Sequence, residues 1–226
     1  MTIIKILNFA VYPTLSAQLL DISKKEWRVL YGADRFAGRQ NPDHSLLECL
    51  ADTPFERITV EQLCRGALIN RSTFYKYYTS KYDLMERYLN RALDGFRRQV
   101  DVAFVNASPQ TIQKLVYQKN FENVLKHLYK HKSEYTLLWS IPLEKDLFSR
   151  MVETVHDAIL ETLPHKNASD PYADLYARLF ASDMMALVRW WFSYEGSVSA
   201  KNVQEIMHKN MTQGIFRAFH EQIQAK

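Results

Sequence analysis

Several residue types are scarce in this chain of 226 residues, and each scarcity excludes something. There are only 6 glycines and 7 prolines, too few for a protein of many short strands and tight turns, and this favours helices. The two cysteines, Cys49 and Cys64, show no C-x-x-C spacing. We expect both to be buried in helices, with a redox-sensing pair as the alternative. Such sparse cysteine use is typical of a cytoplasmic protein.

Long apolar runs are also lacking. The apolar stretch at residues 3–20 is interrupted by Lys5, Asn8 and Pro13, so it is too short and broken to span a membrane. It also lacks the basic region and the clean cleavage site of a signal peptide. We therefore expect no membrane partner and treat residues 1–34 as an N-terminal extension whose role the sequence leaves open.

Enzyme signatures are absent as well. The sequence contains no G-x-S-x-G, H-E-x-x-H, G-x-G-x-x-G or P-loop pattern, so we expect no enzyme and no cofactor. One spacing resembles a metal site, because His127 and His131 are four residues apart. Two histidines without a nearby carboxylate are a weak signal. We expect a solvated helix face and no metal, and a metal-dependent enzyme is only a remote alternative.

Helical periodicity is what the chain does have, and it is most informative at residues 58–89. Thr59 stands at the start of a short helix in the capping-box arrangement, and Asn70 is placed to cap a second short helix, basic and aromatic, at residues 71–78. Ser80 is placed to cap a third helix. Two short helices joined by a tight turn, the second presenting cationic and hydroxyl side chains, predict a helix-turn-helix.

Positive charge is concentrated in the same segment. Residues 57–91 contain seven Lys or Arg and three acidic residues, and this surplus of four equals the formal net charge of +4 for the whole chain. A local basic surplus favours an anionic partner.

The segment INRSTFYKYYTSKYDL, residues 69–84, resembles the recognition helix and following helix of the TetR/AcrR family of bacterial transcription regulators. The resemblance covers roughly residues 46–93. A looser one covers residues 187–207, LVRWWFSYEGSVSAKNVQEIM, which are similar to the end of a C-terminal domain of one TetR subgroup. Leu68 departs from the family pattern, which usually has glycine there, so we expect a strained or reshaped turn in which Gly66 takes part.

The resemblance implies an all-α protein with an N-terminal three-helix helix-turn-helix domain and a C-terminal helical ligand-binding and dimerisation domain. We place the DNA-binding domain at residues 35–93 and the second domain at residues 94–226. By resemblance, base-reading positions are occupied by Arg71, Ser72 and Lys76, and phosphate-holding positions by Thr59, Thr73, Tyr75, Tyr77 and Lys81. The alternative is that this short aromatic helix simply packs, as we expect of Phe74 and Tyr78.

The second half contains the most apolar helix, at about residues 171–194, and a weaker one at about 200–222. A ligand pocket is expected among the aromatic residues Tyr117, Phe121, Tyr129, Trp139, Phe148, Phe180 and Trp190, although plain core is the favoured interpretation for any single one of them. Trp190 and Trp191 differ by about 100° around a helix, so only one faces the pocket. A dimer interface is expected at Val188, Trp191, Met207, Met211, Ile215 and Phe219.

The sequence thus predicts a cytoplasmic, homodimeric transcription regulator that represses by binding a palindromic double-stranded DNA operator and responds to a small-molecule effector. The alternative from another class is a helical adaptor or signalling protein that binds other proteins. Salt-dependent binding to duplex DNA separates the two. The operator, the effector and the choice between repression and activation stay open.

Overall fold

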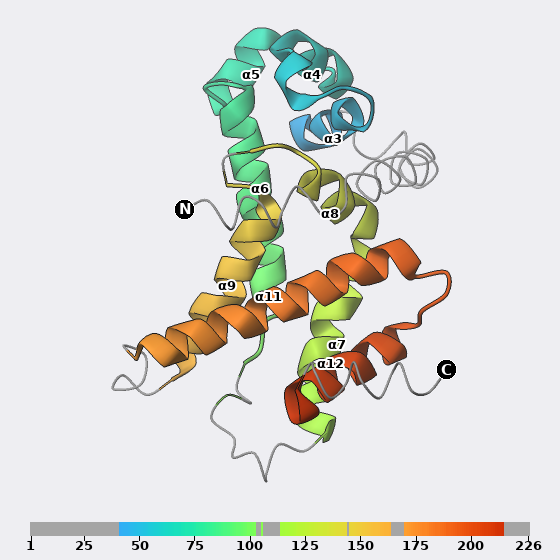
Figure 1. Ribbon diagram of the computed structural model, residues 1–226. Coiled ribbons are helices and arrows are strands. Elements are labelled where there is room, and N and C mark those ends of the chain that lie inside the picture. The colour runs from blue at the N-terminus through green and yellow to red at the C-terminus, as the bar shows by residue number, and fades with distance from the viewer. Residues whose placement is uncertain (1–40, 103–104, 106–113, 144, 164–169, 215–226) are drawn as a thin grey trace. The chain divides into compact units, whose positions relative to one another are not determined.

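A computed structural model describes residues 41–102, 105, 114–143, 145–163 and 170–214 (Figure 1). Every regular element in these ranges is a helix and none is a strand, which confirms the predicted all-α class. The expected N-terminal extension, residues 1–34, lies outside the described residues. Within the described ranges, no helix combines the length and apolarity needed to cross a membrane.

The helices divide into two compact units. In chain order they are α3 (Pro42–Asp52), η1 (Phe55–Arg57), α4 (Val60–Ala67), α5 (Arg71–Tyr77), α6 (Lys81–Arg97), α7 (Lys114–Lys130), α8 (Lys132–Trp139), α9 (Leu147–Thr162), α11 (Pro171–Tyr194) and α12 (Ala200–Gln213). The first unit ends within α6 at Ala92 but also takes residues 131–147, and the second contains the remainder. Helix α8 therefore belongs to the same unit as the helix-turn-helix. The sequence-based boundary after residue 93 had placed it in the second domain.

The caps read from the sequence recur in the first unit. Asn41 precedes α3 and accepts a hydrogen bond from the Asp43 amide at 3.0 Å. Thr59 and Gln62 form a reciprocal capping box at the start of α4. The Ser80 hydroxyl accepts from the Asp83 amide at 3.2 Å. Asn70 occupies the cap position of α5 but its side chain makes no capping hydrogen bond, so α5 depends on its neighbours for its start.

Helices α3 and α4 approach closely through two small residues. The buried Ser45 hydroxyl donates to the Leu63 carbonyl at 2.9 Å. A Cβ atom on Gly66 would lie 2.3 Å from the Ser45 Oγ, far closer than van der Waals contact permits. Gly66 therefore lies inside α4 and permits the packing of α3, which corrects our expectation that it takes part in the turn.

The turn between α4 and α5 instead places Leu68 in the left-handed region, at φ 54° and ψ 39°. The Ile69 amide closes the helix end by donating to the Cys64 carbonyl at 3.0 Å. A side chain at this conformation costs about 1–2 kcal/mol. Because Leu68 is 63% exposed, burial of its side chain offsets little of that strain.

In the second unit, α11 turns side chains of all sizes inward. Ala177, Ala181, Val188, Trp191 and Phe192 are among its buried residues. Helix α12 packs against α11 and α7 and begins with a capping box between Ser199 and Asn202. The described part of α12 ends at Gln213, before Gly214 at φ 82°, so the rest of the helix expected to reach about residue 222 lies outside the described residues.

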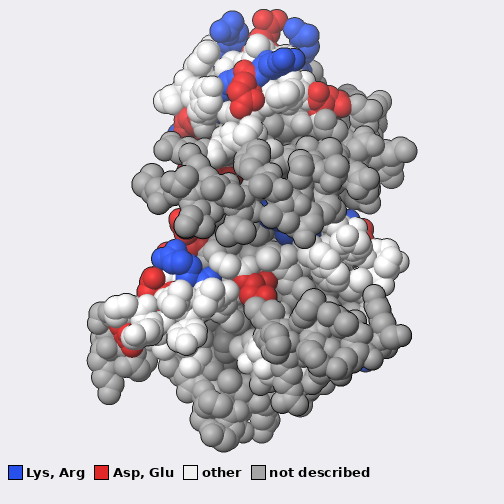
Figure 2. Space-filling view, in the orientation of Figure 1, with Lys and Arg blue, Asp and Glu red and all other residues white. Residues whose placement is uncertain are grey.

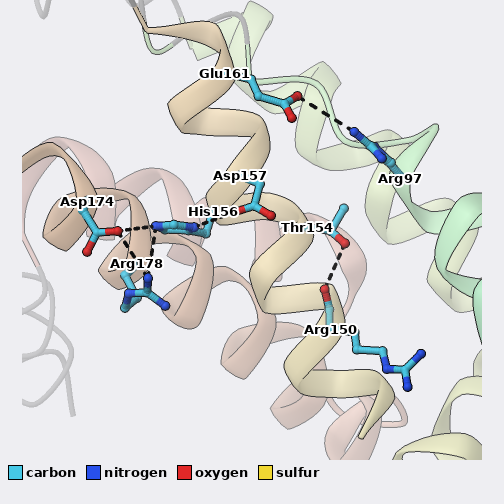
Figure 3. Close-up of polar contacts among 8 residues, drawn as sticks. All are labelled: Arg97, Arg150, Thr154, His156, Asp157, Glu161, Asp174 and Arg178. Atoms are coloured by element: carbon cyan, nitrogen blue, oxygen red, sulfur yellow. Dashed lines mark hydrogen bonds and ion pairs between the residues drawn. The ribbon is translucent and has the colours of Figure 1, made fainter. Parts of the chain in front are cut away.

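A polar cluster also joins α9 to α11 (Figure 3). The buried His156 ring lies between two carboxylates, with Nδ1 2.9 Å from an Asp157 oxygen and Nε2 2.9 Å from an Asp174 oxygen. Arg178 donates to the same Asp174 oxygen at 3.2 Å. The hydrogen bond with His156, and secondly that from Arg178, lower the pKa of Asp174. Its contribution to stability is therefore complete above the ordinary carboxyl pKa and is lost as pH falls through the lowered one.

The strain at Leu68 generates the first prediction. Leu68→Gly should stabilise the first unit by about 0.5–1 kcal/mol, because relief of about 1–2 kcal/mol exceeds the extra flexibility that glycine gives the unfolded chain. Urea unfolding followed by circular dichroism measures the change. Leu68→Ala is the matched control and should leave stability nearly unchanged, since it removes the exposed side chain and keeps the strain. A lower midpoint for the glycine variant would show that the leucine side chain stabilises the turn.

Candidate nucleic-acid interface

Helix α5 is anchored by one side and exposed on the other. Phe74 is completely buried, and its ring contacts the Tyr78 ring at 5.3 Å and the Tyr75 ring edge-on at 5.5 Å. The exposed residues of α5 are the six predicted from the sequence: Arg71, Ser72, Thr73, Tyr75, Lys76 and Tyr77. Thr59 is also exposed, at the start of α4. The structure thus brings the six side chains together on the outer side of one helix, and their individual roles stay predictions.

Cations on this surface differ in how far their charge is already neutralised. Arg65 pairs with Glu61 at 2.9 Å, whereas no carboxylate among the described residues pairs with Arg71. The Lys76 ammonium lies 5.7 Å from the centre of the Tyr77 ring. Figure 2 accordingly shows Lys and Arg side chains interspersed with acidic ones over α4 and α5. The Arg71 guanidinium is therefore free to bind an external acceptor.

A brace that the sequence analysis did not identify holds the turn after α5. The Thr79 amide donates to the Asp83 carboxylate at 2.9 Å, and Arg87 donates to it at 2.8 Å from Nε. These contacts, that of Arg87 first, lower the pKa of Asp83. The Arg87 guanidinium also lies 5.4 Å from the centre of the Tyr78 ring. The four-residue spacing of Asp83 and Arg87 is a recognisable helix pair and is the signal available in the sequence.

Lys81 does not belong with the exposed cations. Its ammonium donates to the carbonyls of Phe55, Glu56 and Ile58 at 3.0, 2.7 and 2.8 Å. It also lies 5.1 Å from the centre of the Phe55 ring and 5.3 Å from that of Tyr82. A lysine has three donors, and all three are used within the chain. This corrects the assignment of Lys81 to a phosphate: the residue fixes η1 against the start of α6.

Both cysteines lie in the first unit, Cys64 buried and Cys49 half-buried, and neither is in a disulfide. Burial is the main cause that raises the pKa of each thiol. A raised pKa keeps both thiols protonated at neutral pH, and so poorly reactive. This favours the structural over the redox interpretation.

The residues expected to line one ligand pocket are dispersed. Phe121 is buried, Phe148 and Phe180 are half-buried, and Trp190 and Tyr129 are exposed. Trp139 contacts Tyr135 in the first unit. The side chain of Tyr117 lies outside the described residues. Only Tyr129 lines the groove that the second unit contains, and Trp191 lines it in place of Trp190.

The expected dimer interface is likewise changed. Val188, Trp191 and Met207 are buried against their own unit, at 0, 3 and 0% exposure, so their side chains are already covered within the chain. Met211 is half-buried. Ile215 and Phe219 lie outside the described residues.

The described residues do not provide the arrangement that a metal site at His127 and His131 would need. Helix α7 ends at Lys130, so His127 and His131 do not share one helix. No group of three or more potential metal-binding side chains occurs within the described ranges.

Comparison with known proteins finds a family match for the helix-turn-helix segment. Residues 45–88 match the model of the bacterial regulatory proteins, tetR family. That segment is therefore similar to the regulatory proteins of the tetR family. It begins in α3 and ends in α6, and thus contains all the residues predicted to contact DNA.

The chain is also similar to a relative from Bacillus subtilis (strain 168), an uncharacterized HTH-type transcriptional regulator, YxbF. The two are 21% identical over 174 residues, which are 76% of this chain and 44% of that relative. The chain thus spans less than half of the relative's length.

The Lys81 contacts generate the second prediction. Lys81→Met should destabilise the first unit by about 1–3 kcal/mol, because three charge-assisted hydrogen bonds to carbonyls are lost. Lys76→Met is the matched control and should change stability by less than about 0.5 kcal/mol, since that ammonium lies on the exposed face. Urea unfolding of both variants provides the comparison. If the Lys81 variant were as stable as the wild type, the three carbonyl contacts would not stabilise the fold, and Lys81 would again count among the cations available to a phosphate.

Proposed function

We propose that this protein is a sequence-specific DNA-binding transcription regulator that inserts α5 into the major groove. The observation that carries the proposal is the exposed side of α5, where no carboxylate of the described residues pairs with the Arg71 guanidinium. Arginine pairs bidentately with guanine in the major groove. Hydroxyl groups of Ser, Thr and Tyr are suited to phosphate oxygens. Buried Phe74 anchors α5, and the Asp83 contacts hold the turn that follows it. Access to DNA requires a cytoplasmic location.

A homodimer is the second part of the proposal, through a surface different from the one expected from sequence. The outer side of α11 exposes a row of large apolar and aromatic side chains: Tyr172, Leu175, Tyr176, Leu179, Trp190 and Tyr194. Several large apolar side chains exposed on one helix favour an interaction site. A second copy of the chain is the natural occupant, because an isologous contact lets one patch cover its own copy. Two copies of α5 then fit a palindromic operator with half-sites about 34–36 Å apart.

Effector control completes the proposal: a small molecule bound in the second unit releases the operator, and the protein acts as a repressor. Support comes from the family and from the groove in that unit, lined in part by Tyr129 and Trp191. Linkage requires that effector and operator weaken each other by the same factor, typically worth about 1–3 kcal/mol. An adaptor protein, the alternative, would bind duplex DNA without sequence preference or not at all.

The DNA proposal predicts a loss of base preference in Arg71→Ala. Duplexes selected from a random pool by the wild type should share a palindrome, and Arg71→Ala should bind it more weakly by about 1–3 kcal/mol and tolerate changes at one base position in each half-site. Fluorescence anisotropy at fixed salt measures affinity for the selected duplex and for its single-base variants.

Arg98→Ala serves as the matched control, because Arg98 is an exposed arginine that follows α6 and does not belong to the unit that contains α5. It should retain the base preference. Unaltered affinity and base preference in Arg71→Ala would show that another surface reads the operator. Failure of the selection to enrich any duplex would favour the adaptor.

The dimer proposal predicts that Leu179→Glu separates the subunits. Leu179 is 56% exposed on α11, so a carboxylate is tolerated in the monomer, but it would be buried without a partner in the dimer. The dimer should weaken by at least about 2 kcal/mol and operator affinity should fall with it. Sedimentation equilibrium measures the association, with Gln213→Glu as the control at an exposed residue of α12. A Leu179→Glu protein that stays dimeric at micromolar concentration would place the interface elsewhere.

A further inference from the structure

The second unit contains a groove of about 450 Å³ between α7, the C-terminal end of α11 and the start of α12. This volume is in the range of small-molecule sites. Its walls combine aromatic, apolar and charged side chains. They are Glu122, Leu125, Lys126, Tyr129, Trp191, Glu195, Val198, Ser199, Lys201 and Gln204, together with Ala200.

One wall is a rigid aromatic pair. The Tyr129 and Trp191 rings stack with their centres 5.4 Å apart and an angle of 23° between their planes. Trp191 is buried and donates from Nε1 to the Val198 carbonyl at 2.9 Å, which ties the α11–α12 turn to α11. Tyr129 is 53% exposed. Flat aromatic surface held in place by hydrogen bonding and stacking favours a planar aromatic ligand, since little order has to be imposed on binding.

The groove contains two carboxylates and two ammonium groups. Glu122 and Lys126 pair with each other across one turn of α7. Glu195 makes other contacts of its own, while its Oε2 is buried without a hydrogen-bond partner among the described residues and would accept a donor. Lys201 is exposed, and no described residue supplies it with a carboxylate partner. The Ser199 hydroxyl is engaged with Asn202 in the capping box. The ammonium of Lys201 is thus the charge that a ligand would neutralise.

We propose that this groove binds a planar aromatic carboxylate, with the ring against Tyr129 and Trp191 and the carboxylate on Lys201. This deepens the proposed effector control and rests on it for the regulatory consequence, while the binding itself does not depend on DNA. Because the groove joins α7 to the α11–α12 turn, a ligand there fixes the ends of these helices to one another. It therefore acts next to Trp190 and Tyr194 on the outer side of α11.

Binding is tested with 2-naphthoate by isothermal titration calorimetry of the full chain without DNA, and with uncharged 2-naphthamide as the matched probe. The wild type should bind one naphthoate per chain. Lys201→Met should weaken naphthoate about five-fold and leave naphthamide unchanged. Lys209→Met, at another exposed lysine of α12, should change neither. Non-saturable binding, or equal losses in the two lysine variants, would overturn the site.

The aromatic wall has its own variants. Tyr129→Ala should weaken both probes about ten-fold, whereas Tyr129→Phe, which keeps the ring, should bind both like the wild type. Equal binding by the alanine variant would overturn the assignment of the ring.

For regulation, saturating naphthoate should lower affinity for the selected operator in the wild type and less so in Lys201→Met. Unchanged operator affinity overturns the effector role of the groove, whereas failure of the chain to bind any duplex overturns the DNA proposal and leaves the calorimetric result standing.

Discussion

The close approach of α3 and α4 is the constraint on which the first unit depends. It exists because Gly66 has no Cβ where the Ser45 hydroxyl lies, and that hydroxyl donates to the Leu63 carbonyl. A larger residue at Gly66 would displace the Ser45 hydroxyl and so disturb its hydrogen bond to Leu63. The chain then passes through the left-handed turn at Leu68 into α5. The start of α5 therefore follows directly from the end of a helix whose packing this contact fixes.

Much of this unit was predictable, because its signals are local. Capping residues, the proline start of α3 and the period of the apolar positions depend on neighbours within four residues, and the structure confirms the capping box at Thr59 and the exposed residues of α5. The role of Gly66 was not predictable, since a glycine near a helix end is equally typical of a turn. Only the position of Ser45, 21 residues earlier in the chain, distinguishes the two.

Lys81 illustrates the same limit for the candidate site. In sequence it is one more lysine beside a basic helix, and the family resemblance assigns it to a phosphate. Its carbonyl partners are 23 to 26 residues away, gathered by η1, a short turn that no periodicity reveals. A lysine that donates to carbonyls of its own chain and an exposed lysine that is available to bind a phosphate have the same sequence pattern. Tertiary structure alone separates them, by whether the three donors are already satisfied.

Helix α11 shows where apolar periodicity stops being informative. Two apolar stripes run beside each other, and the sequence alone does not say which one faces inward. The buried side contains the small Ala177 and Ala181 but also the large Trp191 and Phe192, whereas tyrosines and leucines elsewhere on the helix are exposed. Neither size nor hydrophobicity alone therefore predicts the inward side, which depends on the elements that pack against the helix.

Trp190 and Trp191 join the two proposals for the second unit. Consecutive positions on a helix point about 100° apart, so Trp190 belongs to the exposed row of α11 and Trp191 to the groove. The Trp191 ring is held by Tyr129 against its face and by the Val198 carbonyl at its Nε1 edge. A ligand against that ring acts on the same helical turn whose other side carries Trp190, which contacts the Tyr194 ring at 5.3 Å. Groove and outer row thus share one rigid backbone segment, and a ligand that shifts it alters the surface proposed to meet the second subunit.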